Sequence, residues 1–366
     1  MIVDADRLPT VGERRLAVRV TADALRQIRG GSPWLYDGSI TSVSHDGAPG
    51  DLAVVFDDRR KFAAIGLWDP TSPIRVKVLH VGSPATIDAA WLQGRLSAAL
   101  DRRRALAEDP DTTGYRCVHG ENDGLPGIVV DRYDATLVVK VYTPAWFPHL
   151  DAVTEALVAL TGPERVVLRL GRSVAAGETF GLADGDTLVG PAPTGPVRFR
   201  ERGLVLEADV VHGQKTGHFL DQRDNRALVR GMAAGADVLD VFASTGGFSV
   251  SAAAGGASSV HLIDQSAPAL ETARRNLAHN DRLPEVRRCA VHTTTGDAFH
   301  VLADLAKRGD QFDIVIVDPP SFASNRAAVD RALAAYARLT RLALGVVRPG
   351  GTLVQSSCSR RVSADE

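Results

Sequence analysis

The sequence predicts an α/β fold with three parts in a chain of 366 residues. After Asp221, apolar strand-like runs alternate with helical patterns, which is typical of a parallel doubly wound sheet. Before that point, short β-like runs are followed by a mixed α+β segment. We therefore expect a β-rich domain at residues 1–80, an α+β middle domain at 81–205 and the doubly wound domain at 206–366.

Composition places the chain among folded globular proteins. Hydrophobic residues make up 45% and charged residues 23%, close to the averages for that class. The 42 basic and 44 acidic residues give a net charge of −2, so nucleic-acid contacts would have to use local basic patches.

The cysteine pattern and the hydropathy suggest a cytoplasmic protein. Three widely spaced cysteines without a C-x-x-C pair argue against a disulfide framework and a zinc site, so we expect reduced thiols and assign no metal. No apolar run reaches the roughly 18 residues of a spanning helix, and the N-terminus lacks the apolar core of an export signal. We expect neither a membrane segment nor secretion.

The first domain is predicted from short strands separated by turn-rich pieces such as RGGSP and HDGAPGD. The strand-like runs are residues 16–20, 39–43, 51–56, 62–68 and 74–79. This pattern predicts a small β-barrel or sandwich.

The middle domain mixes helices and strands. Apolar residues at helical spacing predict a helix over Asp88–Glu108. The runs GIVVDRY and TLVVKVY predict a hairpin, and a second helix is expected from Ala145 to Leu160. A strand RVVLRL and two further strand-like runs then lead to Val210.

In the last domain five strands alternate with four helices, and the strands are in DVLDVFA, SVHLID, CAVHTTTGDAF, FDIVIVDPP and GGTLVQSSCS. Ligands of such sheets bind at the carboxyl ends of the strands. We therefore expect Asp240, Asp264, Asp318 and Cys358 to meet at one edge.

The segment from Asp240 to Ser249, DVFASTGGFS, is predicted to be a cofactor loop. Two adjacent glycines between a strand and a helix let the backbone pass close to a ligand. The loop lacks G-x-G-x-x-G, which makes room for a pyrophosphate, so a nucleoside such as S-adenosylmethionine fits better than a dinucleotide. The expected cofactor residues here are Asp240, Phe242, Ala243, Ser244, Gly246 and Gly247.

Two further acids follow predicted strands. Asp264, next to Gln265, is placed to accept hydrogen bonds from ribose hydroxyls, or else to cap the helix that starts near Ser266. Asp297 is placed to meet the adenine amine, and a capping role is an equally good interpretation. We include Gln265 with both acids among the expected cofactor residues.

The run from Phe312 to Phe322 predicts one edge of a pocket. Five residues of buried-strand character lead into Asp318, and Pro319 and Pro320 end the strand and stiffen the loop. Asp318 is placed to hydrogen-bond a planar substrate or the cofactor, with a plain turn as the alternative.

Cys358 is a candidate nucleophile because the last strand delivers it to the same edge. Arg360 and Arg361 would lower the pKa of its thiol. Cys117 and Cys289 are instead expected to be small buried hydrophobic residues.

In this order and spacing, LDVFASTGGFS, HLIDQS, DPPSF and SSCS resemble the class I S-adenosylmethionine-dependent RNA methyltransferases, whose catalytic domain is Rossmann-like. The segments GGSPWLYDGSI, ENDGLPGIVVDRY and TGHFLDQRDN are similar to bacterial 5-methylcytosine methyltransferases of large-subunit rRNA, which carry an N-terminal PUA domain. The resemblance covers nearly the whole chain.

This resemblance implies a covalent mechanism. Carbon 5 of a pyrimidine becomes nucleophilic once a thiolate adds to carbon 6, and Cys358 would be that thiolate. Asp318 would steady the ring nitrogen, and the carbonyl groups of Pro319 and Pro320 would bind the exocyclic amine. We assign no base for the carbon-5 proton.

The resemblance also implies that the protein's partner is large-subunit rRNA. We expect the protein itself to be a monomer or a homodimer. The expected RNA contacts are Arg26, Arg29, Trp34, Lys215, Arg223 and Arg326. Gln214 and Gln222 belong to the same segment as Lys215, GQKTGHFLDQR. The resemblance implies that this segment lines the cofactor or RNA site. Segment 323–361 carries seven arginines and one aspartate, as expected for holding a phosphate backbone.

One departure from the family pattern concerns the C-terminus, where eight residues follow Cys358. The family fold continues through a helix and two strands, so we expect the last strand to form an exposed edge, with reduced stability or activity. A nitrogen-methylating RNA enzyme with a bystander Cys358 and a non-catalytic PUA-type RNA-binding protein are the alternatives. A nicotinamide oxidoreductase is disfavoured because G-x-G-x-x-G is absent.

Overall fold

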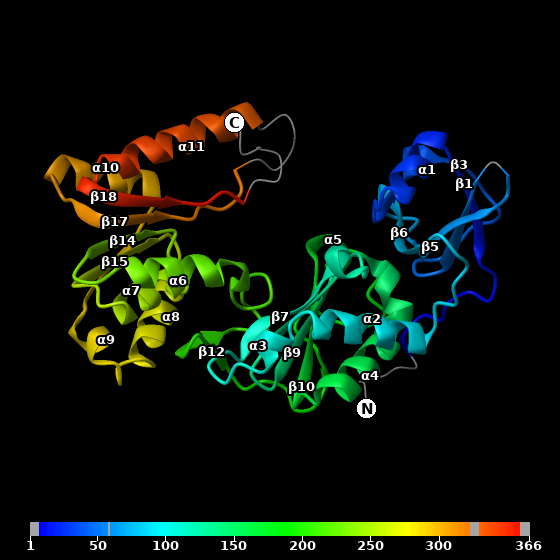
Figure 1. Cartoon of the computed structure of the whole chain (residues 1–366), viewed down its shortest axis with the longest axis horizontal. Helices are drawn as coiled ribbons and strands as arrows, with labels where there is room; N and C mark the ends of the chain where they lie inside the picture. Colours follow the sequence, from blue (N-terminus) through cyan, green and yellow to red (C-terminus); the bar gives the residue numbers. More distant parts are fainter. Residues whose placement is uncertain (1–6, 58, 323–328, 359–366) are drawn as a thin grey trace. The chain divides into compact units, whose positions relative to one another are not determined.

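The computed structural model describes residues 7–57, 59–322 and 329–358 (Figure 1). The chain forms two compact units, Met1–Arg200 with Ala208–His218, and Glu201–Glu207 with Phe219–Glu366. The predicted α/β class is confirmed. None of the helices in the described ranges combines the length and hydropathy that crossing a membrane requires.

The N-terminal strands form a six-stranded sheet in the order β2-β6-β5-β4-β1-β3. The strands are β1 (Leu16–Val20), β2 (Trp34–Tyr36), β3 (Ile40–Val43), β4 (Leu52–Phe56), β5 (Phe62–Trp68) and β6 (Ile74–Val81). Neighbours pair antiparallel except β1 and β4. All six strands belong to one sheet, which excludes the two-layer sandwich of the two predicted architectures, barrel and sandwich.

A helix that the strand pattern did not predict, α1 (Ala22–Arg29), follows β1. The Thr21 hydroxyl accepts a hydrogen bond from the Ala24 amide and caps its first turn. Leu25 and Ile28 are buried at helical spacing. The helix was missed because its eight residues carry one short apolar face between strongly β-like runs.

The rest of the first unit holds a five-stranded sheet in the order β11-β10-β9-β8-β7. Its strands are β7 (Gly114–His119), β8 (Ile128–Tyr133), β9 (Thr136–Val141), β10 (Arg165–Leu170) and β11 (Thr187–Val189). The predicted hairpin is confirmed, since β8 and β9 pair antiparallel, whereas β9 and β10 are parallel. The 3-10 turns η2 (Asp37–Ser39) and η3 (Gly120–Asp123) also belong to this unit.

Both helices predicted for the middle segment are interrupted. The first is divided into α2 (Ala89–Asp101) and α3 (Arg104–Ala107), and at the break Arg102 and Arg103 both donate to the buried Asp123 carboxylate. The second starts as a 3-10 turn, η4 (Pro144–His149), before α4 (Leu150–Thr161), because the Pro148 ring cannot donate an amide hydrogen bond. A short helix, α5 (Arg172–Ala175), follows β10.

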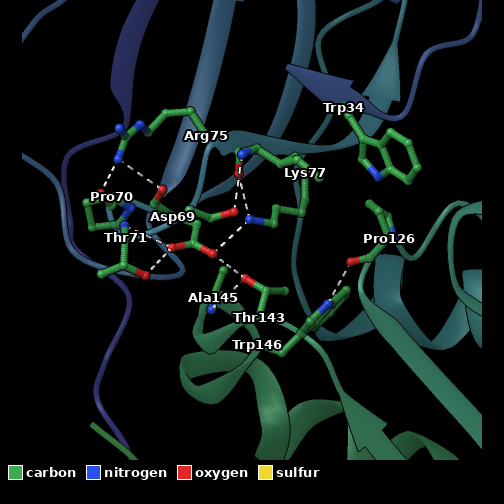
Figure 2. Close-up of polar contacts among 12 residues, drawn as sticks. Trp34, Asp69, Pro70, Thr71, Arg75, Lys77, Pro126, Thr143, Ala145 and Trp146 are labelled. Atoms are coloured by element: carbon green, nitrogen blue, oxygen red, sulfur yellow. Dashed lines mark hydrogen bonds and ion pairs between the residues drawn. The ribbon is translucent and has the colours of Figure 1, made fainter. Parts of the chain in front are cut away.

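The two sheets of this unit share one hydrophobic core, in which Leu52 and Ile65 of the first sheet join Val130 and Val139 of the second. A buried polar cluster also links them (Figure 2). The Asp69 carboxylate lies 2.7 Å from the Lys77 amine and accepts a 2.6 Å hydrogen bond from the Thr143 hydroxyl. Burial alone would raise the pKa of Asp69, but these hydrogen bonds outweigh it and lower the pKa.

The second unit contains the predicted doubly wound parallel sheet, in the order β16-β15-β14-β17-β18. The strands are β14 (Asp237–Val241), β15 (Ser259–Asp264), β16 (Ala290–Thr295), β17 (Phe312–Val317) and β18 (Val347–Gln355). Among the described residues, β18 lies at one edge of this sheet.

Helices cover both faces of this sheet (Figure 1). One side carries α6 (Arg223–Met232), α7 (Gly247–Ala254), α8 (Ala267–Ala278) and α9 (Pro284–Arg288), and the other carries α10 (Ala298–Arg308) and α11 (Val329–Leu344). The chain reaches this unit through the hairpin of β12 (Val197–Glu201) and β13 (Leu204–Ala208), and the turn η5 (Leu220–Gln222) precedes α6.

Replacing Asp69 with alanine should lower the free energy of unfolding of the first unit by about 3–5 kcal/mol, because Lys77 would be left as an uncompensated buried charge. All four tryptophans lie in this unit, so urea unfolding followed by tryptophan fluorescence isolates its transition. The double variant Asp69→Ala/Lys77→Met should recover part of the loss.

In the wild type, the contribution of Asp69 to stability should be present above about pH 4 and be lost on further acidification, because the pKa of Asp69 is depressed in the folded protein. An Asp69→Ala protein as stable as wild type would contradict this account.

Candidate functional site

The strand ends that carry the predicted motifs meet at the carboxyl edge of the parallel sheet. Val241 of β14 pairs with Ile263 of β15 on one side and with Val317 of β17 on the other. Val317 in turn pairs with Gln355 of β18. The motifs that follow these four residues therefore emerge from adjacent strands, as the alternating pattern predicted.

The loop after β14 makes a tight turn into helix α7. Phe242, Ser244 and Gly246 all have positive φ angles, of 64°, 49° and 76°. A Cβ on Gly246 would lie 2.6 Å from the Cβ of Ala273, so glycine is required by contact as well as by conformation. The buried Ala243 donates its amide to the Ile263 carbonyl, and Gly247 begins α7. This is the close backbone turn that a bound nucleoside requires.

Asp264 organises the same loop from the end of β15. One carboxylate oxygen accepts from the Ser244 amide and the other from the Ser266 amide, each at 2.8 Å. The helix α8 is capped by the Ser266 hydroxyl, so the capping interpretation of Asp264 is wrong. Each oxygen of a carboxylate accepts more than one hydrogen bond, so Asp264 also retains capacity for ribose hydroxyls.

Asp297 acts as a helix cap. Its carboxylate accepts from the amides of Phe299 and His300 at the start of α10. The exposed Gln265 side chain donates to its other oxygen at 3.0 Å. Of the two interpretations left open for Asp297, the structure bears out the cap, and contact with adenine stays a prediction.

Asp240 lies behind the loop and is 1% exposed. Its carboxylate accepts from the amide and the hydroxyl of Ser249 in α7, at 3.1 and 2.6 Å. Burial raises the pKa of Asp240 to about 7, and the charges of Asp318 and Asp264 act in the same direction. Asp240 therefore ties β14 to α7 beneath the loop.

The sequence pattern missed Asn276, which supports the loop from α8. Its fully buried side chain donates to the Thr245 carbonyl at 2.8 Å and accepts from the Glu207 amide at 2.9 Å. Asn276 lies in α8 and Asn280 two residues past its end, and both side chains are fully buried, where an amide needs partners.

Asp318, the first residue after β17, is held by a hydrogen-bonded chain from helix α6 and the turn before it. Gln222 is buried and donates to one Asp318 carboxylate oxygen at 2.9 Å, and the Asn225 side chain donates to Oε1 of Gln222 at 2.6 Å. After Asp318, Pro319 is buried and Pro320 is exposed. Resemblance alone had associated Gln222 with the site, and the structure adds the contact with Asp318.

Cys358 is exposed and lies three residues beyond the last ladder pair of β18. The Ser356 amide donates to the Val317 carbonyl, so the segment after β18 stays beside the end of β17. The Ser357 hydroxyl lies 3.3 Å from that of Tyr336 in α11. Cys117 and Cys289 are buried, as predicted, and burial raises the pKa of each thiol, to about 12 and about 11.

The predicted RNA contacts are dispersed over the chain. Arg26 and Arg29 lie on α1 and pair with Asp23 and Asp57. The half-buried Trp34 donates its indole N–H to Glu121 at 3.1 Å.

The later predicted contacts belong to other parts of the chain. Lys215 belongs to the first unit, whereas Arg223 begins α6 in the second. Arg326, Arg360 and Arg361 lie outside the described residues.

A hollow of about 540 Å³ lies at the opposite edge of the sheet, where β14, β15 and β17 begin. Its lining includes His261, His292 and Arg308. It contains none of the expected catalytic, cofactor or RNA-binding residues, and its size alone does not make it the site.

Two families of known proteins match the chain. The family described as S-adenosylmethionine-dependent methyltransferase matches residues 116–365, and a PUA-like domain matches residues 18–80. The chain is 48% identical over 364 residues to a ribosomal RNA large subunit methyltransferase of Deinococcus radiodurans, covering 98% of this chain and 88% of that protein. It is 33% identical to the ribosomal RNA large subunit methyltransferase I of Pseudoalteromonas translucida, covering 94% and 85%.

A solved structure has the same fold. The crystal structure of SMU.776, described as a methyltransferase complexed with SAH, superposes with a TM-score of 0.80 at 22% identity. The match covers 96% of this chain and 87% of that one.

The buried Asp240 should make the stability of the second unit depend on pH. A folded pKa of about 7 against about 3.9 in the unfolded chain means that the folded state binds the proton more tightly. Stability from this group should therefore fall as pH rises from about 4 to 7, by a few kcal/mol at most.

In Asp240→Asn this decline should be absent, while the exposed control Asp281→Asn should behave as wild type. The measurement is thermal unfolding at several pH values, using the circular-dichroism transition that tryptophan fluorescence does not report. Equal pH dependence in Asp240→Asn and wild type would be the contrary result.

Proposed function

Because the chain belongs to the family of S-adenosylmethionine-dependent methyltransferases, we propose that it methylates carbon 5 of a cytosine in large-subunit ribosomal RNA through a covalent adduct with Cys358. The observation that carries this proposal is the emergence of Asp318 and Cys358 from neighbouring parallel strands. We infer further that the three parts expected from the sequence, 1–80, 81–205 and 206–366, divide RNA binding, positioning and chemistry among them.

The proposed substrate is supported by two findings. The relatives at 48% and 33% identity carry names that refer to large-subunit ribosomal RNA. The chain also has a PUA-like domain at residues 18–80. The target base has to leave its stack to reach a pocket at the edge of a sheet, which favours a loop or an unpaired position in the RNA.

The loop after β14 and the end of β15 fit the family cofactor. S-adenosylmethionine, when bound, supplies an electrophilic methyl group. The backbone of Phe242, Ser244 and Gly246 is held in a tight turn that a nucleoside can approach, and Asp264 offers acceptors for ribose hydroxyls. Asp240 and Asn276 keep the loop in place from below.

Cys358 has the exposure that a nucleophile needs, whereas the other two thiols are buried with raised pKa values. Its thiolate adds to carbon 6 of the cytosine, which makes carbon 5 enamine-like and able to accept the methyl group. Loss of the carbon-5 proton then expels the thiolate and restores the aromatic ring. Asp318, fixed by Gln222, holds the ring nitrogen, and the carbonyl groups of Pro319 and Pro320 bind the exocyclic amine.

Replacing Cys358 with alanine should abolish methyl transfer, because carbon 5 is a poor nucleophile without the adduct. Nucleoside mass spectrometry of unmodified large-subunit rRNA, incubated with S-adenosylmethionine and protein, should detect 5-methylcytidine with wild type alone. The matched control is Cys289→Ala, a buried thiol of the same unit, which should retain activity.

A Cys358→Ala protein that still methylates rRNA would contradict the covalent mechanism. A methyl group on a nitrogen would favour the alternative enzyme, in which Cys358 is a bystander. Failure to bind S-adenosylmethionine in calorimetry would favour a non-catalytic RNA-binding protein.

Gln222→Ala should lower kcat roughly 10- to 100-fold, the value of one hydrogen bond to a charged group, while the affinity for S-adenosylmethionine stays as in wild type. Gln222→Glu should also shift the pH–rate profile, since a second carboxyl group beside Asp318 disfavours ionisation of both. Gln311→Ala, an exposed glutamine just before β17, serves as the control. A Gln222→Ala enzyme with wild-type kcat would show that Asp318 needs no help from this residue.

A further inference from the structure

The face of the β7–β11 sheet that turns away from the shared core is polar and partly covered by the segment Ala208–His218. Arg169 of β10 donates to two carbonyl groups of this segment, and Lys140 of β9 donates to a third at 2.6 Å. The Thr216 hydroxyl donates to the fully buried Asp131 of β8 at 2.6 Å. These contacts lie within one compact unit.

Tyr142 stands at the end of β9 on this face and is 50% exposed. It follows Lys140 by two residues, so both side chains point to the same side of the sheet. The Lys140 amine lies 5.7 Å from the centroid of the Tyr142 ring. Gly171 lies beside the ring, and a Cβ there would lie 3.3 Å from Cδ1 of Tyr142, so a larger residue would crowd the ring.

The backbone that carries Tyr142 is held on both sides. Its amide donates to the Gly127 carbonyl at 2.9 Å, and the preceding Val141 carbonyl accepts from Gly171 at 2.8 Å. The following residue, Thr143, is fixed by its hydrogen bond to the buried Asp69 (Figure 2). An exposed aromatic ring on a rigid strand end presents a large contact surface at little cost in conformational entropy.

Charged side chains of both signs lie near this ring. Arg116 faces Asp131 and Arg169 faces Asp184, so these four charges balance. Lys140 donates to an uncharged carbonyl group and keeps its positive charge. Burial and then the charge of Arg169 lower the pKa of Lys140, which reflects the crowding of cations here.

Further charged groups act on the ring or lie beside it. Burial raises the pKa of Tyr142 and the positive charge of Arg116 opposes that rise, while Asp131 and Glu121 add to it. Arg172, exposed at the start of α5, follows Gly171 directly, and Lys215 belongs to the covering segment. With both charged residues of the covering segment included, the surface has five cationic and four acidic side chains, which leaves one positive charge in excess: Arg116, Lys140, Arg169, Arg172 and Lys215 against Glu121, Asp131, Asp184 and Asp209.

We propose that this surface binds a single-stranded segment of the substrate RNA, with a nucleobase stacked on Tyr142 and the flanking phosphates held by Lys140 and the exposed Arg172. The inference rests on the proposed function in that it takes RNA to be the substrate. An aromatic face set among cations is how proteins bind unpaired RNA irrespective of sequence, through stacking and phosphate contacts. The excess of positive charge favours this polyanion over a protein partner.

The test is binding of a fluorescein-labelled, unstructured oligoribonucleotide of about 12 nucleotides to the full chain, measured by anisotropy without S-adenosylmethionine. Tyr142→Ala should weaken binding about 5- to 100-fold, the range for loss of one stacked base, and Tyr142→Phe should stay within about twofold of wild type. Arg172→Ala should reduce the slope of affinity against salt concentration. Photo-crosslinking with 5-iodouridine should attach RNA to the peptide that contains Tyr142.

The control is Val291→Ala, because Val291 is 40% exposed on β16 of the other unit and belongs to no expected RNA or cofactor contact. Unchanged binding by Tyr142→Ala, or an equal loss in Val291→Ala, would overturn the proposal. A loss in Tyr142→Phe as large as in Tyr142→Ala would also overturn it, since it would assign the effect to the hydroxyl.

The same experiment separates this inference from the proposed function. A wild-type protein that binds no RNA overturns both. RNA binding that depends on Tyr142, in a protein that methylates no rRNA, supports the stacking surface and contradicts the proposed chemistry.

Discussion

Parallel pairing of β14, β15, β17 and β18 is the constraint on which the site depends. A parallel ladder brings the carboxyl ends of its strands to one edge, so Val241 and Val317, which are 76 residues apart in the chain, end neighbouring strands side by side. Asp264, Asp318 and Cys358 each follow the end of a different strand. A change in register between β17 and β18 would move Cys358 relative to Asp318 without altering either residue.

The loops at the carboxyl edge of the parallel sheet keep their conformation because buried polar groups hold them. Asp240 binds Ser249, Asn276 binds the carbonyl of Thr245, and Gln222 binds Asp318. Each group is buried, and each would be costly to bury without its partner. Hydrogen-bonded polar residues beneath the loops thus pre-organise a surface on which the exposed residues do the chemistry.

The segment from Ala208 to Gln222 connects binding and chemistry along the chain. Its first part is fastened by Lys140, Arg169 and Asp131 to the polar face of the first unit, next to the exposed ring of Tyr142. Four residues after His218, the last residue of that part, Gln222 donates to Asp318 in the second unit. One short stretch therefore contributes to the proposed RNA surface and to the position of a proposed catalytic carboxylate.

The sequence by itself determined the α/β class, the doubly wound order of the last domain and the strand ends that carry the motifs. These features depend on periodicity and on turn residues within about ten positions, which can be read locally. The tertiary structure alone decided that Gln222 holds Asp318 across 96 positions and that Asn276 supports the cofactor loop. It also showed that Ser266 and not Asp264 caps α8, and it placed Tyr142 beside Lys140. Such pairings depend on which distant side chains folding brings within hydrogen-bonding distance. The local spacing of residues in the sequence does not predict them.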